Sequence, residues 1–297
     1  MQRHPSQASP WRQRSLPLGK STAATIAAMS STLHLAPRLA EGRTAEIFRL
    51  EGGRVLKLFR PGWGEGDARY EARKAEAVYA AGLPAPAVHG VTQVDERFGI
   101  VYEEIVGRPL MESLQRRPWA IHETARFLAD LHLQVHKARI PALPRVADRL
   151  TRAIERAPEL AEQERASLLT LLGRLPGGNA VCHGDFHPGN VYLTERGPII
   201  LDWMDATQGN PVADVARTAV LFRAAVLPQD MPGRRVIELI RRAFLRAYLR
   251  QYSAATPAEP DQFLAWNAVV AGARLAERIP GEEKRLLALV AAGLRDQ

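Results

Sequence analysis

The sequence predicts an α+β fold in which a small sheet-containing region comes first and a larger, mostly helical region follows. Short runs rich in β-branched and aromatic residues, separated by glycines, are concentrated in residues 45–105. Amphipathic patterns rich in Ala and Leu dominate from residue 119 onward. The 297 residues, of which 46% are hydrophobic and 24% charged, suit one large globular domain or two modest ones.

The first region, residues 41–106, is expected to be a small domain built around a hairpin. Glu51-Gly52-Gly53 separates the first two strand-like runs, and a Gly-Gly turn favours a tight connection between antiparallel strands. Gly82 and two prolines end the Ala-rich helix that follows. The expected elements are strands 45–50 and 54–59, a helix 67–81, and strands 88–94 and 98–105.

The second region, residues 107–297, is expected to be helical apart from one short β section in its middle. Ala125, Leu128, Leu131 and His132 recur at helical spacing in its first long helix. The expected helices are 119–137, 147–157 and 161–175, followed from residue 212 to the end by four or more that include 234–252, 262–279 and 282–294. The expected strands are 180–182, 191–194 and 198–202.

We expect residues 1–40 to be a flexible leader, or an upstream extension of a chain that begins at Met29, in preference to the transit peptide that an Arg- and Ser-rich start resembles. They contain no Asp or Glu and carry five of the eight net positive charges. The remaining chain is therefore nearly balanced, which argues against a nucleic-acid partner. No apolar run reaches the length of about 18 residues that a membrane helix needs, so no membrane partner is expected.

A single cysteine, Cys182, excludes an intramolecular disulfide and a cysteine-based zinc site. A reducing compartment is compatible with this, and we expect a cytoplasmic location. The sequence does not predict an oligomeric state.

The sharpest chemical signal is the segment Cys182-His-Gly-Asp-Phe-His-Pro-Gly-Asn190, followed by a strand that ends at Asp202. Phosphoryl transfer needs a carboxylate to orient an attacking hydroxyl and hard oxygen ligands for Mg²⁺ on the triphosphate. Asp185 suits the first role as the catalytic base. Asn190 and Asp202 suit the second as metal ligands.

This assignment predicts further parts upstream. Lys57 lies among apolar residues of a strand, where it could project toward phosphates, although a solvated edge-strand lysine is the simpler interpretation of that residue alone. Glu71 on the next helix is the expected ion-pair partner, with Glu76 as the alternative. The turn at Gly42 could cover the phosphates, but one glycine is a weak phosphate-loop signal.

Together these segments resemble the aminoglycoside phosphotransferase / choline kinase family of protein-kinase-like small-molecule kinases. The resemblance covers about residues 40–220, and the segment around Asp185 is its most specific part. The matching stretches begin at Gly42, Val55, Glu71, Glu103, Leu128, His183, Leu201 and Gly209.

The resemblance implies a bilobal fold and an ATP- and Mg²⁺-dependent transfer of the γ-phosphate to a hydroxyl of a small molecule. Lys57 and Glu71 would serve the nucleotide phosphates, and the backbone around Glu103–Ile105 would bind adenine. Asp202 is followed by Trp and Met, where protein kinases have Phe and Gly. No activation segment of protein-kinase length follows Asp202, and this absence argues against protein substrates. The acceptor and the choice between ATP and GTP stay open.

Other interpretations compete with a kinase. His183, Asp185 and His187 alternate by two residues and could bind a metal in a metallohydrolase. A nucleotide-binding regulator without catalysis would retain the same residues. We expect His183 to brace its loop and His132 to be a satisfied core histidine.

Two acidic residues are also open to simpler explanations. Asp214 is expected to complement a helix dipole in a first turn. Asp205 could either assist a metal or lie exposed in a turn.

Overall fold

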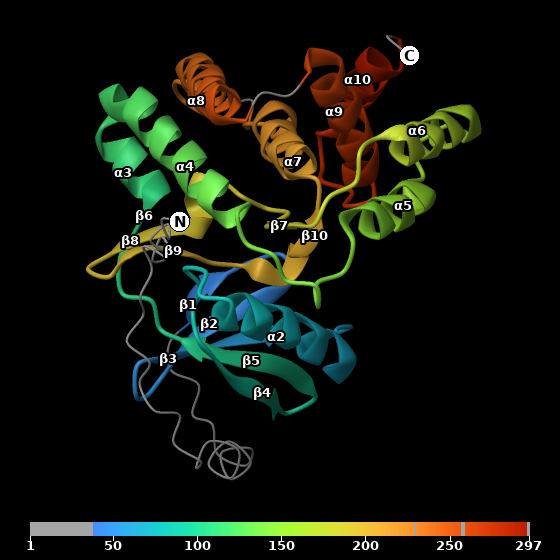
Figure 1. Cartoon of the computed structure of the whole chain (residues 1–297). Coiled ribbons are helices and arrows are strands. Elements are labelled where there is room, and N and C mark those ends of the chain that lie inside the picture. The colour runs from blue at the N-terminus through green and yellow to red at the C-terminus, as the bar shows by residue number, and fades with distance from the viewer. Residues whose placement is uncertain (1–37, 229, 257–258, 296–297) are drawn as a thin grey trace, which may run out of the picture. The chain divides into compact units, whose positions relative to one another are not determined.

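The computed structural model describes residues 38–228, 230–256 and 259–295, which form two compact units (Figure 1). The first unit contains the described residues up to Gly107 together with Thr194–Met204. The second contains Arg108–Leu193 and the chain from Asp205 onward. Asp202 thus belongs to the first unit although it lies far along the chain. Most of the expected leader falls outside the described residues, and Arg38 begins the first strand.

The first unit contains a five-stranded antiparallel sheet in the order β1-β2-β3-β5-β4. Its strands are β1 (Arg38–Glu41), β2 (Ala45–Leu50), β3 (Arg54–Phe59), β4 (Val88–Val94) and β5 (Arg97–Glu103). The β2–β3 hairpin has the bounds predicted from the sequence. β1 was not predicted, because its four residues are exposed and carry no apolar alternation.

Strand β3 presents different residues to the two faces of this sheet, because successive side chains of a strand point in opposite directions. Leu56 and Leu58 pack into one apolar cluster. Phe59 packs into another, with Ala68 and Ala72 of helix α2 (Glu65–Ala80). Lys57 has the parity of Phe59 and therefore lies on the α2 side of the sheet.

The segment Thr194–Met204 is bonded to other residues of the first unit. It contains β9 (Gly197–Ile200), whose Ile200 N–H donates to the Pro84 carbonyl at 2.7 Å. The Lys74 ammonium donates to the Met204 carbonyl. Trp203 is buried and donates to the Ile200 carbonyl at 2.8 Å. These bonds bracket Asp202 on both sides.

The second unit is predominantly helical and has one large apolar core. Helix α7 (Pro211–Ala224) and helix α9 (Pro260–Leu275) contribute many of its fully buried side chains, Trp266 among them. The other helices are α3 (Leu110–Arg116), η2 (Pro118–Ala120), α4 (Ile121–Val135), α5 (Val146–Arg156), α6 (Glu162–Arg174), η3 (Pro188–Asn190), α8 (Arg234–Ala255) and α10 (Glu283–Arg295).

Short strands surround the segment that carries Asp185. Strand β7 (Ala180–Cys182) pairs with β10 (Thr207–Gly209), and β6 (Arg108–Pro109) pairs with β8 (Val191–Thr194) through Arg108 and Pro109. β6, β10 and α3 were not predicted, since two- and three-residue strands and a seven-residue helix leave little periodicity in a sequence.

In the described residues no helix is both long enough and apolar enough to cross a membrane.

Arg274 and Glu282 join α9 to the turn before α10 through a buried bidentate ion pair with distances of 2.6 and 3.0 Å. We predict that Arg274→Met lowers the free energy of unfolding by about 3–5 kcal/mol, because it leaves the Glu282 carboxylate buried without its cation. Arg274→Met combined with Glu282→Leu should lose much less. Urea unfolding of both variants measures this, and equal losses would contradict the explanation.

Candidate functional site

In the first unit, Lys57 lies between two carboxylates. Its Nζ is 2.8 Å from Glu71 Oε1 and 2.9 Å from Asp202 Oδ1. Burial disfavours the ammonium, but the charges of Asp202 and Glu71 outweigh it and raise the pKa of Lys57 above its ordinary value. Lys57 is therefore a permanent cation on a central strand, and the solvated edge-strand interpretation is wrong. Glu71, and not Glu76, is its partner.

Tyr102 is a member of this cluster that the sequence analysis missed. Its hydroxyl donates to Glu71 Oε1 at 3.1 Å, and burial raises the pKa of Tyr102 well above its ordinary value, so it remains a donor. Glu71 Oε2 is buried and has no hydrogen-bond partner among the described residues. Tyr102 lies on the same face of the sheet as Lys57, because it is paired with Val55 in the β3–β5 register. The sequence alone does not give this register.

Asp202 has a left-handed backbone, with φ of 61°. This conformation is costly for a residue with a Cβ, and such strain is concentrated at functional sites. The bonds of Ile200 and Met204 described above keep the segment in place on either side. The carboxylate of Asp202 on this turn contacts the Lys57 ammonium.

The remaining site candidates of the first unit, Gly42 and the segment 103–105, have less support from their contacts. Gly42 lies in the β1–β2 turn and its N–H donates to Ala45 O at 2.8 Å; a Cβ there would make only ordinary contacts. The N–H groups of Glu103 and Glu104 donate to Ala87 O and Gly53 O at 2.9 and 2.8 Å. Of the 103–105 segment, this leaves the Ile105 N–H as the backbone donor to consider for a ligand.

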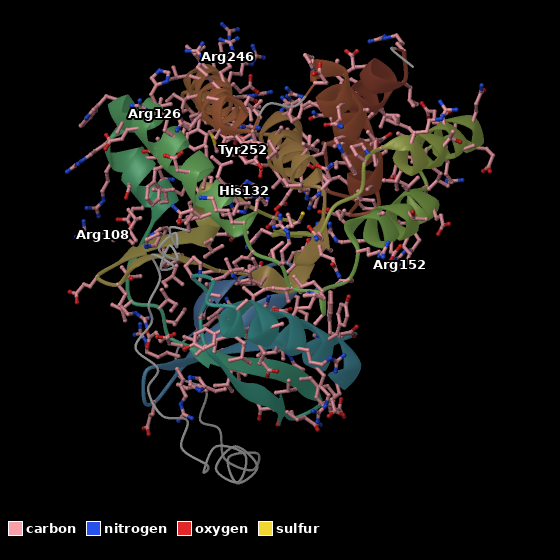
Figure 2. All side chains as sticks on the ribbon, viewed as in Figure 1. Arg108, Arg126, His132, Arg152, Arg246 and Tyr252 are labelled. Atoms are coloured by element: carbon pink, nitrogen blue, oxygen red, sulfur yellow. The ribbon has the colours of Figure 1, made fainter. Side chains whose placement is uncertain are left out.

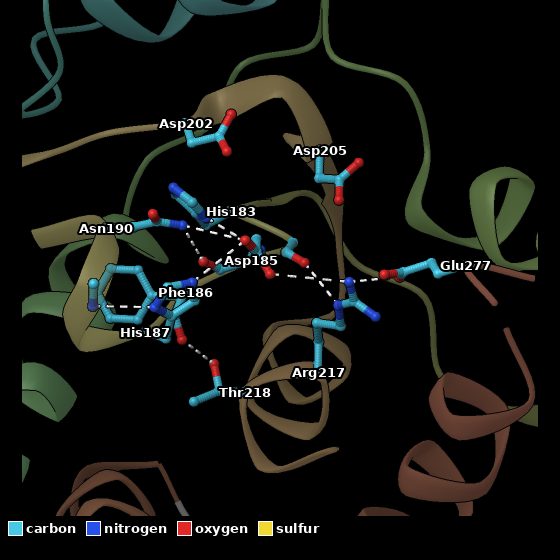
Figure 3. A network of polar contacts seen from close by, with 12 residues as sticks. His183, Asp185, Phe186, His187, Asn190, Asp202, Asp205, Arg217, Thr218 and Glu277 are labelled. Atoms are coloured by element: carbon cyan, nitrogen blue, oxygen red, sulfur yellow. Dashed lines mark hydrogen bonds and ion pairs between the residues drawn. The ribbon is translucent and has the colours of Figure 1, made fainter. Parts of the chain in front are cut away.

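In the second unit, residues 182–190 leave β7 and form what we call the Asp185 loop (Figure 3). Gly184 has a φ of 82°, and a Cβ there would lie 2.6 Å from the Asp205 carbonyl. The position therefore requires glycine on both conformational and steric grounds. As predicted, His183 braces the loop, because its Nδ1 accepts the Asp185 N–H at 3.1 Å.

Three side chains on one face of α7 bind the backbone of the Asp185 loop. The Asp214 carboxylate accepts the N–H groups of His183 and Gly184 at 2.5 and 2.8 Å. Arg217 Nε donates to the Gly184 carbonyl and Thr218 Oγ1 to the Phe186 carbonyl, both at 2.9 Å (Figure 3). Positions i, i+3 and i+4 share a helix face, so one helix satisfies four polar groups of the loop.

Asp214 is therefore more than a residue that complements a helix dipole. It lies in the first turn of α7, as expected, but it is buried at 2% exposure. Burial works against its ionisation, but electrostatic interaction and hydrogen bonds with His132 and His136 hold the pKa of Asp214 well below its ordinary value. The buried carboxylate remains an anion that accepts four hydrogen bonds.

The side chain of Asp185 lies beside His187, Asn190 and Arg217. Burial alone would raise its pKa, but the hydrogen bond of His187 and the charge of Arg217 lower it below the ordinary value. Arg217 Nη2 lies 3.9 Å from Asp185 Oδ1 and 2.6 Å from Glu277 Oε1 (Figure 3). Asp185 is thus an ionised carboxylate at neutral pH on an anchored loop.

Asn190 directs its amide nitrogen toward Asp185. Its Nδ2 donates to the Asp185 carbonyl at 2.9 Å and to Oδ2 at 3.2 Å. The amide oxygen then points the other way, and an amide oxygen is a ligand that Mg²⁺ accepts.

Asp205 forms an ion pair with Arg149 at 2.7 Å, which accounts for Asp205 as a partly exposed turn acid.

A buried cluster of His132, His136 and Asp214 is the one group in the described residues with metal-ligand spacing. Asp214 Oδ2 lies 2.9 Å from His132 Nε2 and 3.2 Å from His136 Nε2. Both Nδ1 atoms lie within 2.7 Å of a tyrosine hydroxyl, from Tyr248 and Tyr252 of α8 (Figure 2 labels His132 and Tyr252).

Hydrogen bonds satisfy every ligand atom of this cluster, so it functions as structural support for the Asp185 loop. His132 is a satisfied core histidine, as predicted, whereas the tyrosines of α8 were missed. His183, Asp185 and His187 form no such group in the described part of the chain, so the geometry gives no support to the metallohydrolase alternative.

The matching family model is described as a phosphotransferase enzyme family and spans residues 36–263. A search of curated proteins found no match.

Solved structures with similar folds include the following three proteins. A thermostable mutant of aminoglycoside phosphotransferase APH(4)-Ia, in ternary complex with AMP-PNP and hygromycin B, has a TM-score of 0.63 at 16% identity and covers 91% of this chain and 97% of its own. A choline/ethanolamine kinase family protein from Mesorhizobium loti has a TM-score of 0.54 at 17% identity, covering 92% and 98%. An aminoglycoside-3'-phosphotransferase of type VIII has a TM-score of 0.53 at 21% identity, covering 79% and 90%. The protein-kinase-like fold predicted from the sequence is confirmed.

The buried His132 makes stability depend on pH. Burial, together with the neighbouring His136, lowers its pKa from 6.5 to about 3 in the folded chain, so the unfolded chain binds one more proton between these values. We predict that stability falls by up to about 1.4 kcal/mol per pH unit as pH drops below 6.5. His132→Gln should be less stable at pH 7, and its deficit should shrink toward pH 5. Chemical denaturation at pH 7, 6 and 5 tests this; a constant deficit would contradict it.

Proposed function

Because the chain belongs to the phosphotransferase enzyme family, we propose that it is an ATP- and Mg²⁺-dependent kinase that transfers the γ-phosphate to a hydroxyl of a small molecule. The observation that carries this proposal is the Asp185 carboxylate, which is ionised, partly exposed and anchored through its loop to α7. Phosphoryl transfer needs little covalent chemistry from the protein, and a fixed carboxylate supplies much of what it does need.

Asp185 is the catalytic base in this proposal. Its carboxylate accepts a hydrogen bond from the acceptor hydroxyl, aims the oxygen at phosphorus and takes up the proton as the new bond forms. A low pKa makes Asp185 a weak base, so orientation of the hydroxyl is its larger contribution. The four backbone contacts from Asp214, Arg217 and Thr218 keep the loop from moving, which favours catalysis by positioning.

The first unit would bind the nucleotide. Lys57 is a permanent cation that Glu71 and Asp202 hold in one orientation, which suits contact with phosphate oxygens. The backbone of Glu103–Ile105 would bind adenine, and the Ile105 N–H is our choice of donor because the N–H groups of Glu103 and Glu104 already donate within the unit. Gly42 could cover the phosphates, with its N–H engaged in its own turn.

Asn190 and Asp202 are the residues that would bind Mg²⁺. The amide of Asn190 has its nitrogen committed to Asp185 and its oxygen directed away, and Asp202 uses Oδ1 for Lys57. One amide oxygen and one carboxylate fit a cation that retains several waters and phosphate ligands. When bound, Mg²⁺ would neutralise charge on the triphosphate.

We predict that Asp185→Asn lowers phosphotransfer by about 10²–10⁴-fold and changes ATP affinity less than twofold, because the amide cannot accept the hydroxyl proton. The measurement is γ-phosphate transfer from Mg·ATP to a panel of amino alcohols, sugars, amino-sugar antibiotics and nucleosides, with ATP affinity from calorimetry. The exposed Asp261→Asn serves as the matched control. Equal turnover of wild type and Asp185→Asn would overturn the assignment. A wild type that binds ATP and phosphorylates nothing would indicate a regulator.

A further inference from the structure

The two ring nitrogens of His187 perform different tasks in the Asp185 loop. Nδ1 accepts the Gly189 N–H at 3.0 Å, which makes His187 the N-cap of η3. An Nδ1 that accepts a hydrogen bond carries no proton, so in the neutral ring the proton is on Nε2. Nε2 therefore carries the ring N–H, and it lies 3.5 Å from Asp185 Oδ2.

Gly189 fixes the position of the imidazole ring. A Cβ at residue 189 would lie 2.8 Å from His187 Cε1 and 3.0 Å from Nδ1, so the ring packs directly against the glycine backbone. The side chain of His187 is 33% exposed, but its orientation is determined by this packing and by the N-cap bond. The donor at Nε2 therefore has a defined direction.

The surroundings distinguish the two oxygens of the Asp185 carboxylate. Oδ2 accepts from Asn190 Nδ2 at 3.2 Å and faces His187 Nε2. Within the described part of the chain, Oδ1 accepts no hydrogen bond; its nearest cation, Arg217 Nη2, is 3.9 Å away and is bonded to Glu277 instead. Oδ1 is thus the oxygen that keeps its full capacity to accept a proton.

We infer that His187 is a positioning residue of the phosphotransfer reaction: with Asn190 it fixes Oδ2 of Asp185, so that Oδ1 is the oxygen that receives the acceptor hydroxyl. This inference rests on the proposed function. It assigns the N-cap to Nδ1 and the orientation of the base to Nε2. If His187 were only the N-cap of η3, Nδ1 would be the one ring nitrogen that matters.

Two substitutions separate these tasks, because each amide reproduces one ring nitrogen. His187→Asn retains an acceptor at the position of Nδ1, and Asn is among the best N-cap residues, but it has no donor that reaches Asp185. His187→Gln places an amide N–H near the position of Nε2 and caps poorly. The experiment measures kcat, the KM for ATP and the melting temperature of both variants, with Mg·ATP and the best acceptor of the panel, and with water as acceptor through phosphate release.

We expect His187→Asn to melt like the wild type and to lose about tenfold in kcat with an unchanged KM for ATP. His187→Gln should melt lower and retain most of its kcat. The opposite pattern, with His187→Asn fully active and His187→Gln impaired, would overturn the inference and leave His187 as a cap. Loss of activity in Asp185→Asn alone would support the proposed function while refuting this one.

A second measurement does not depend on turnover. Nitrogen NMR of protein labelled with ¹⁵N-histidine, with the His187 signals assigned by their loss in His187→Asn, reports which ring nitrogen carries the proton. A protonated Nε2 with an unprotonated Nδ1, and an Nε2 shift that changes in Asp185→Asn, is the expected result. A proton on Nδ1 in the neutral ring would overturn the inference.

Discussion

The buried carboxylate of Asp214 is the group on which the geometry of the second unit depends. It accepts two backbone N–H groups of the Asp185 loop and the Nε2 atoms of two histidines, each of which lies against a tyrosine of α8. A buried anion is tolerated only when hydrogen bonds replace its water. Here the same bonds that stabilise the charge also connect α4, α7 and α8 to the loop, so core packing determines where Asp185 lies.

The first unit solves a related problem with opposite charges. Lys57 is a cation placed on the α2 side of the sheet by strand alternation, and two carboxylates from distant parts of the chain stabilise it. One of them, Asp202, has a left-handed backbone conformation. Both units therefore use buried or partly buried ion pairs to orient a few groups, which suits the phosphoryl transfer that we propose.

Whether the sequence revealed a site residue depended on whether that residue stands in a local pattern or is defined by a distant contact. Lys57, Asp185, Asn190 and Asp202 stand in local patterns, either a charge next to apolar residues or a punctuated loop, and Glu71 was expected only as a partner for Lys57. Tyr102, Arg217, Thr218, Tyr248 and Tyr252 stand in ordinary helical or strand patterns and gain their meaning from a partner more than 30 residues away. Asp214 was noticed but assigned to a helix dipole, because a first-turn acid is common and its burial is invisible in one sequence.

The sequence by itself determined the fold class, the hairpin of residues 45–59 and most helices, and it singled out the Asp185 loop, because periodicity and loop residues act over a few positions. Only the tertiary structure decided that Thr194–Met204 belongs with the first unit, that Glu71 pairs with Lys57 where Glu76 does not, and that Asp214 binds the loop. It also distinguished the two oxygens of Asp185. These choices depend on strand register, helix facing and burial, which arise when distant segments exclude water from one another.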